Sequence, residues 1–150
     1  MTQTPHQEQS RVMTAAKVVG AVFLLVGILG FIPGVTSSYS SLSFAGHMSE
    51  AKLLGIFQVS ILHNIVHILF GIAGIAMARR ADSARTYLVG GGIVYLVLWI
   101  YGLVTSDQSS ANFVPVNTAD DWLHLVLGLG MIALGILLSR RRAESSTGTR

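Results

Sequence analysis

The sequence predicts an all-α fold class: an integral membrane four-helix bundle built from two repeated transmembrane hairpins. Three observations predict it, namely long apolar blocks, basic residues gathered on one side of those blocks, and a short internal repeat. Of the 150 residues, 51% are hydrophobic and only 11% are charged, whereas ordinary soluble domains carry about 25% charged residues. Because the apolar residues run in long blocks and not at amphipathic spacing, we expect them to face lipid.

Four apolar blocks are long enough to cross a bilayer. We expect spans at about 12–32, 58–78, 86–106 and 120–139, inside a transmembrane domain of residues 11–142. The first block ends at Pro33-Gly34, a pair that stops helices. The polar tails, 1–10 and 143–150, are expected to be disordered. The alternative, a signal peptide cleaved after Ser43-Phe44-Ala45, lacks a small-residue site directly after its apolar stretch.

The basic residues predict the orientation of the chain. Nine of the ten Lys and Arg residues precede or begin the first span, join the second span to the third, or follow the fourth, and Lys52 alone lies on the other side. The positive-inside rule therefore places both the N and the C terminus in the cytoplasm.

Composition also excludes several classes of function. Cysteine is absent, which excludes disulfides, thiolate metal sites, iron–sulfur ligation and thiol catalysis. The basic residues are not interleaved with aromatic residues, so we expect no binding of nucleic acid. The expected partner is the lipid bilayer, with a second copy of the chain or another membrane protein as a further partner.

A short internal repeat relates the second span to the fourth. Shifting the chain by 57 positions (124 − 67) aligns rare polar residues and glycines: His67 with His124, Asn64 with Asp121, His63 with Asp120, and Gly71 with Gly128. The two hairpins would then be related by an approximate two-fold axis along the membrane normal. The repeat also predicts where helices begin. We expect one start near Ser60 and another capped by Asn117 or Thr118, with Asp121 binding free backbone N–H groups.

Helical spacing gathers polar residues on one stripe of each of these two spans. Counting about 1.5 Å per residue from the expected helix starts places His67 and His124 about 10 Å below the outer boundary. Polar side chains at that depth are functional candidates, since lipid does not solvate them. The candidate polar cluster is His63, Asn64, His67, Asn117, Asp120, Asp121 and His124.

Glycines predict where the helices pack closely, because small residues let membrane helices approach each other. The expected packing positions are Gly27, Gly30, Gly71, Gly74, Gly128 and Gly135. Tyr95, Trp99 and Gly102 share a stripe of the third span, which we interpret as a packing or dimer surface.

The polar cluster leaves several interpretations open. It is a network of interhelical hydrogen bonds that fixes register, or a pathway or site for protons or a small solute, since histidine titrates near neutral pH. The alternative is a haem or metal protein. In the haem interpretation, His67 and His124 would be paired ligands of a b-type haem, and a glycine one turn below each histidine would leave room for the haem ring. In the zinc interpretation, the metal would be held by His63, His67, His124 and an aspartate.

Nothing in the sequence favours an enzyme. The His-x-x-x-His pair does not match the metalloprotease motif, because Asn64 stands where that motif has its general-base glutamate. No hydrolase, P-loop or dinucleotide motif occurs. We therefore expect a non-enzymatic membrane protein with no cofactor, with haem or a divalent metal as the alternative.

Four segments of the chain carry a resemblance to a known family. They are Phe31-Ile-Pro-Gly-Val-Thr36, Leu53-Leu-Gly-Ile-Phe-Gln-Val-Ser60, Leu62-His-Asn-Ile-Val-His67 with Gly71, and Asn117-Thr-Ala-Asp-Asp-Trp-Leu-His124 with Gly128. In these segments the chain resembles a bacterial family of small four-helix membrane proteins, known as domain of unknown function family four-three-eight-three. The resemblance covers roughly residues 14–140, with Ser60 where asparagine is associated with the family. It implies a multi-pass protein of the bacterial inner membrane and no chemistry.

Overall fold

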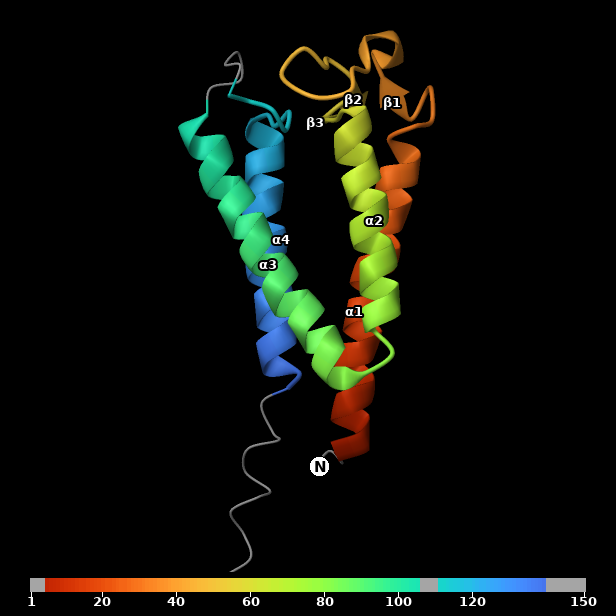
Figure 1. Ribbon diagram of the computed structural model, residues 1–150, viewed down its shortest axis with the longest axis vertical. Coiled ribbons are helices and arrows are strands. Elements are labelled where there is room, and N and C mark those ends of the chain that lie inside the picture. The colour runs from red at the N-terminus through yellow and green to blue at the C-terminus, as the bar shows by residue number, and fades with distance from the viewer. Residues whose placement is uncertain (1–4, 106–110, 140–150) are drawn as a thin grey trace, which may run out of the picture.

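The computed structural model describes residues 5–105 and 111–139 (Figure 1). Within these residues the chain is all-helical apart from three two-residue strands and a short 3-10 turn, which confirms the predicted all-α class. The elements are α1 (Pro5–Leu29), β1 (Thr36–Ser37), η1 (Tyr39–Ser41), β2 (Lys52–Leu53), β3 (Phe57–Gln58), α2 (Ile61–Met77), α3 (Ala81–Val104) and α4 (Thr118–Leu137).

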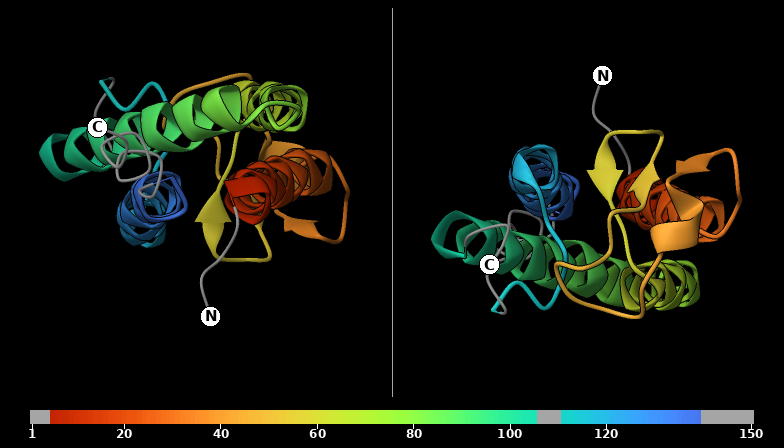
Figure 2. Two further views of the ribbon diagram at one scale, coloured as in Figure 1. Left: turned by 90° about the horizontal axis from the view of Figure 1, so that it is seen from below. Right: turned by 90° about the horizontal axis from the view of Figure 1, so that it is seen from above.

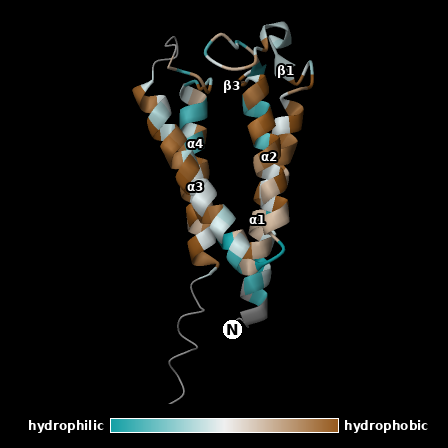
Figure 3. Ribbon diagram, in the orientation of Figure 1, coloured by the Kyte–Doolittle hydropathy of each residue, from teal (hydrophilic) through white to brown (hydrophobic). Residues whose placement is uncertain are grey.

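Three helices are long and apolar enough to cross a membrane, over Gln9–Leu29 of α1, Ala81–Val104 and Thr118–Leu137. They indicate a membrane protein in contact with lipid. The fourth helix, α2, is apolar but has only 17 residues. Most residues of the helices are hydrophobic, and one group of hydrophilic residues lies where α1 begins and where α2 turns into α3 (Figure 3).

The helix bounds differ from the expected spans mainly at the beginnings of α1 and α3. α1 begins at Pro5, so residues 5–10, which we expected to be a disordered tail, are helical. Likewise α3 begins at Ala81, five residues before the expected start (86 − 81). An apolar pattern marks the part of a helix inside lipid and not the polar turns that extend it into water. The expected tail at 143–150 lies outside the described residues.

The helices pack as two antiparallel pairs, α1 with α2 and α3 with α4 (Figures 1 and 2). The pairs approach each other at the end that holds the N-terminus and diverge towards the strands (Figure 1). A buried core fills the convergent end and includes Phe23, Tyr87, Leu88, Tyr95 and Met131. The pairs therefore share a packed, convergent end and a wider end that carries the strands and loops, and this wider end is called the outer end.

Glycines bring the two helices of each pair into close contact. A Cβ at position 71 would lie 2.5 Å from the backbone nitrogen of Leu24 in α1, and one at position 92 would lie 2.7 Å from the backbone oxygen of Gly128. Of the other glycines predicted to pack, Gly27, Gly30, Gly74 and Gly135 also face a neighbouring helix. No side chain larger than hydrogen fits at these contacts without displacing a neighbour.

A small antiparallel sheet, in the order β1-β2-β3, covers the outer end of α1 and α2. Thr36 pairs with Leu53, and Lys52 pairs with Gln58. Ala51, Leu53 and Val59 are buried beneath this sheet as a second hydrophobic cluster. Residues 52–58, just before the second helix, therefore form a hairpin that positions the start of α2.

Candidate functional site

The start of α2 is fixed by a nearly complete set of hydrogen bonds. The backbone N–H groups of Ile61 and Leu62 donate to the carbonyl oxygens of Ser43 and Phe44, at 3.0 and 2.9 Å. The next N–H, of His63, donates to Oγ of Ser60, the N-cap residue, at 3.1 Å. The helix thus begins one residue after Ser60, as the repeat predicts. Because the backbone N–H groups of the first turn are hydrogen-bonded, this end of the helix is not expected to fray, and the histidines of α2 keep a fixed position along the helix axis.

The start of α4 is a capping box. Asn117 Oδ1 accepts from the N–H groups of Ala119 and Asp120, and Asp120 Oδ2 accepts in return from the N–H of Asn117, at 3.0 Å. We expected Asp121 in this role, and the structure assigns it to Asp120, because the reciprocal carboxylate of a capping box stands three residues after the cap.

The same two residues tie the hairpins together at their outer ends. The N–H of Gln58 in β3 also donates to Asp120 Oδ2, at 3.0 Å, and Asn117 Nδ2 donates to the carbonyl oxygen of Ile56, at 2.9 Å. Asn117 and Asp120 therefore serve the outer loops and do not take part in a cluster with the histidines.

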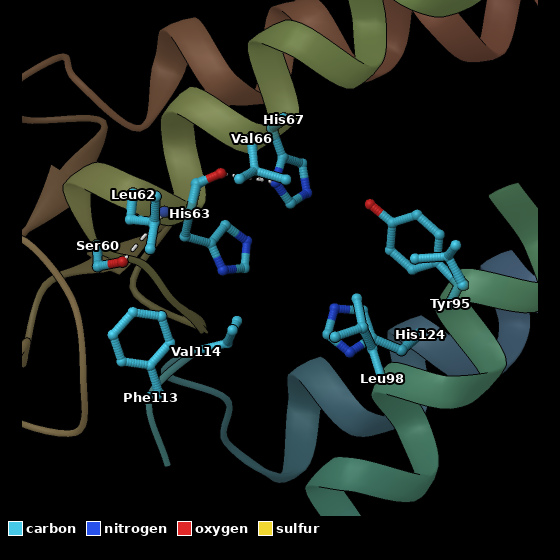
Figure 4. A pocket seen from close by; sticks show the side chains of 11 residues that line it. Ser60, Leu62, His63, Val66, His67, Tyr95, Leu98, Phe113, Val114 and His124 are labelled. Atoms are coloured by element: carbon cyan, nitrogen blue, oxygen red, sulfur yellow. Dashed lines mark hydrogen bonds between the residues drawn. The ribbon is translucent and has the colours of Figure 1, made fainter. Parts of the chain in front are cut away.

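A cavity of about 220 Å³ lies between the two hairpins, below their outer loops (Figure 4). The histidines of both hairpins point into it, with His63 and His67 coming from α2 and His124 from α4 (Figure 4). The remaining lining is almost entirely apolar or aromatic. It consists of Ser60, Leu62, Val66, Val94, Tyr95, Leu98, Phe113 and Val114.

His67 is oriented by its own helix. Its Nδ1 lies 3.0 Å from the backbone oxygen of His63, and because a carbonyl oxygen only accepts, Nδ1 is the donor. In the neutral imidazole this leaves Nε2 with a free lone pair. The rings of His63 and His67 stack with their centroids 4.4 Å apart and their planes inclined by 9°. His67 thus presents a hydrogen-bond acceptor to the cavity.

His124 faces the cavity from the other hairpin. Its side chain is only 3% exposed, and its ring packs against Tyr95 with the centroids 5.3 Å apart. Nδ1 of His124 and Nδ1 of His63 are both buried and have no hydrogen-bond partner among the described residues. Buried polar atoms without a partner are uncommon in proteins and call for an explanation, such as a ligand or ordered water.

Asn64 and Asp121, which the repeat pairs, lie inside the hairpins and not in the cavity. The Asn64 amide lies against Gly30, which directly follows α1, and the Asp121 carboxylate lies against Gly102 of α3, so closely that a Cβ on either glycine would overlap it. Gly71 and Gly128 face the same partner helices. The polar residues of each span therefore do not share a single stripe. Asn64 follows His63 by one residue, which turns it by about 100° around the helix and away from the histidines.

The haem interpretation does not fit this arrangement. It needs room below the histidines at Gly71 and Gly128, but those positions are filled by the backbone of α1 and by Leu96 and the backbone of α3. The cavity is also smaller than the roughly 300–1,000 Å³ of sites for drug-sized ligands. Nor do the described residues contain any group of three or more His, Asp or Glu side chains placed to hold a metal ion, so the expected zinc set is not assembled.

Aromatic residues of other helices complete the site and were not in the predicted cluster. Tyr95, which we interpreted as part of a packing or dimer surface, lines the cavity and is 4% exposed. Phe23 of α1 packs against both His67 and Tyr95, with ring centroids 5.5 and 5.2 Å apart. Apolar residues of a membrane helix look alike in sequence whether they face lipid or a cavity. Among these residues only Tyr95, with its polar hydroxyl group, could have been recognised from the sequence as a candidate.

Comparisons with known proteins identify a family but no activity. No curated protein and no solved structure matches this chain. One family model matches it over residues 13–137 and is described as a domain of unknown function, DUF4383. The matched region includes the whole of α2, α3 and α4 and hence every residue that lines the cavity. The chain therefore belongs to the DUF4383 family.

Proposed function

We propose that this protein crosses the bacterial inner membrane four times and binds a small, uncharged, hydrogen-bonding molecule in the cavity formed by His63, His67 and His124. The proposal has two parts, the membrane topology and the binding site. The course of the chain supports the topology, and the hydrogen bonding of the histidine nitrogens supports the binding site.

The course of the chain supports a crossing by α2. After α1 the chain emerges at the end opposite Pro5 and passes through the strands. It then returns along α2 and begins α3 beside the beginning of α1 (Figure 1). The 17 residues of α2 therefore run along the length of two membrane-spanning helices. They give about 25 Å of helix, within reach of a hydrocarbon core of about 30 Å.

The distribution of basic residues supports a cytoplasmic position for the convergent end. Arg11, Arg79, Arg80 and Arg85 lie at the convergent end, whereas Lys52 lies in β2 at the strand end. By the positive-inside rule the strands, and the cavity beneath them, are on the outer side of the membrane.

The packing of the two hairpins supports an internal repeat. Gly20 of α1 packs against Gly71 of α2, and Gly92 of α3 packs against Gly128 of α4. Gly20 and Gly92 lie on the first helix of their respective hairpins and are 72 positions apart (92 − 20). Phe23 and Tyr95 on the same two helices are also 72 positions apart (95 − 23). The aligned histidines of the two copies, His67 and His124, both face the shared cavity, so a duplicated hairpin accounts for a site at the junction between copies.

The observation that favours binding over a structural network is the hydrogen bonding of the histidines. Among the described residues, their only side-chain hydrogen bond joins His67 to the backbone of its own helix. A network that fixed the register of the helices would join His67 to His124 across the cavity. The rings instead converge on a space of about 220 Å³, which is larger than the engineered cavity of about 150 Å³ that binds benzene.

A fluorine NMR titration tests the binding site with para-fluorophenol, a compact ring that carries one O–H donor. We expect saturable broadening and shift of the fluorine signal for the protein in nanodiscs, and a weaker effect for fluorobenzene, which cannot donate to His67. Filling the cavity by Leu98→Trp should abolish binding. Val97→Trp is the matched control, because Val97 is on the same helix and 59% exposed.

The result that contradicts the proposal is equally clear. If para-fluorophenol gives no saturable signal, or gives the same signal with the Leu98→Trp and Val97→Trp proteins, the cavity is not a binding site. The structural network then remains as the explanation of the histidines.

A further inference from the structure

We infer that the cavity receives its ligand from the lipid phase, through an opening between α2 and α3, and that this ligand is an uncharged amphiphile with an O–H or N–H donor at its head and an apolar tail. The inference rests on the proposed binding site. It adds the route of entry and the chemical class of the ligand.

The opening is marked by residues that line the cavity and also reach the surface. Val66 of α2 and Val94 of α3 both line the cavity, and each side chain is 51% exposed. The surface around them is that of a membrane span, since Leu69 and Val97 beside them are 60% and 59% exposed. The cavity therefore meets the outside of the protein where that outside is covered by lipid.

The outer loops lie across the cavity on the side that faces water. The N–H of Gly46 donates to the carbonyl oxygen of Phe113 at 2.8 Å, which joins the loop of one hairpin to that of the other. Phe113 and Val114 form the part of the lining beneath this contact. Viewed from above, both loops cross the space between α2 and α4 (Figure 2, right). An extended ligand thus finds its path sideways between the helices.

The polarity of the lining changes from the opening to the interior. The opening consists of valine side chains, and the interior presents His67, His124 and Tyr95 (Figure 4). His67 offers an acceptor at Nε2, which selects a head group that donates. No Lys, Arg, Asp or Glu is among the described residues that line the cavity, so a charged head group has no counter-charge there and would be costly to desolvate.

Competition against para-fluorophenol in nanodiscs tests both parts of the inference. The probe is para-hexylphenol, whose tail passes through the opening when its hydroxyl reaches the histidines, and hexylbenzene is the control that lacks a donor. We expect para-hexylphenol to displace para-fluorophenol and hexylbenzene to displace it poorly. The Val66→Trp substitution narrows the opening, so it should weaken para-hexylphenol by about ten-fold and weaken para-fluorophenol, which does not extend through the opening, by much less.

The matched control is Leu69→Trp, which adds the same ring to the lipid-facing surface of α2 without touching the cavity. If para-fluorophenol binds but para-hexylphenol does not displace it, or if Val66→Trp weakens both phenols equally, the lateral route is wrong while the binding site stands. If para-fluorophenol itself does not bind, the binding site and this inference both fail.

Discussion

The hydrogen bond from His67 Nδ1 to the backbone oxygen of His63 determines which nitrogen of His67 can accept a hydrogen bond from a ligand. It fixes the ring orientation and leaves Nε2 as an acceptor. The imidazole also packs against the stacked ring of His63 and the tilted ring of Phe23. The depth of His67 could be predicted from the helix start, but its hydrogen bonding could not, because the sequence does not show which groups surround a ring.

Replacing His67 by phenylalanine should weaken para-fluorophenol without unfolding the protein. A phenyl ring keeps the contacts with Phe23, 5.5 Å away in the native structure, but it has no acceptor. The loss of one hydrogen bond of about 1 kcal/mol corresponds to a roughly five-fold weaker affinity. The fluorine NMR titration measures it. His47→Phe in the outer loop is the control, and equal weakening by both substitutions would contradict the role of His67.

The three consecutive glycines of α3, Gly90 to Gly92, differ in their contacts with other helices. Gly92 meets the backbone of Gly128, whereas nothing lies within 4 Å of a Cβ placed at position 90. The sequence does not show which glycine of the triplet makes the contact with α4. The rotation of α3 about its axis depends on its partners, and lipid-facing and protein-facing residues are equally apolar.

The matched pair Gly92→Ala and Gly90→Ala tests this contact. Gly92→Ala places a methyl group 2.7 Å from a backbone oxygen that cannot move aside, so we expect destabilisation of about 1–3 kcal/mol. Gly90→Ala should be neutral or stabilising by up to about 1 kcal/mol, because alanine favours helix. Unfolding midpoints in detergent compare the two, and similar values for both variants would refute the packing of α3 on α4.

The capping box of α4 was predictable from sequence because it depends on residues three positions apart. Its links to Gln58 and Ile56 were not, since they join segments about 60 positions apart. Asn117→Ala should therefore cost more than the roughly 1 kcal/mol of an ordinary cap. Thr118→Ala, at an exposed neighbouring position, is the control. Equal unfolding midpoints for the two variants would show that the cap and its link to the β2–β3 turn do not contribute.

At the scale of the whole molecule, the hydrophobic pattern of the sequence predicts the helices. It does not predict how the two hairpins are arranged relative to each other. The sequence identifies four apolar segments and pairs His67 with His124 through the repeat. It does not show that the hairpins diverge at the outer end (Figure 1), because divergence depends on packing between α3 and the first hairpin. The cavity exists only because of that divergence, so its lining of Tyr95, Leu98 and Phe113 could not be predicted.

The absence of native cysteine makes the topology simple to measure. Single cysteines at Ser40, in the 3-10 turn near the strands, and at Asp82, in the first turn of α3, are both exposed. A membrane-impermeant maleimide applied to spheroplasts should label Ser40→Cys and spare Asp82→Cys until the membrane is permeabilised. Labelling of both in intact spheroplasts would contradict a crossing by α2.

The most direct test of the histidine cavity is nitrogen NMR of the imidazoles in protein labelled at histidine, recorded with increasing para-fluorophenol. We expect the Nε2 resonance of His67 to shift saturably as it accepts a hydrogen bond, with smaller shifts for His63 and His124, and no shift for His47 in the outer loop. A para-fluorophenol titration that leaves His67 unchanged, or that shifts His47 as much as His67, would contradict the proposed binding site.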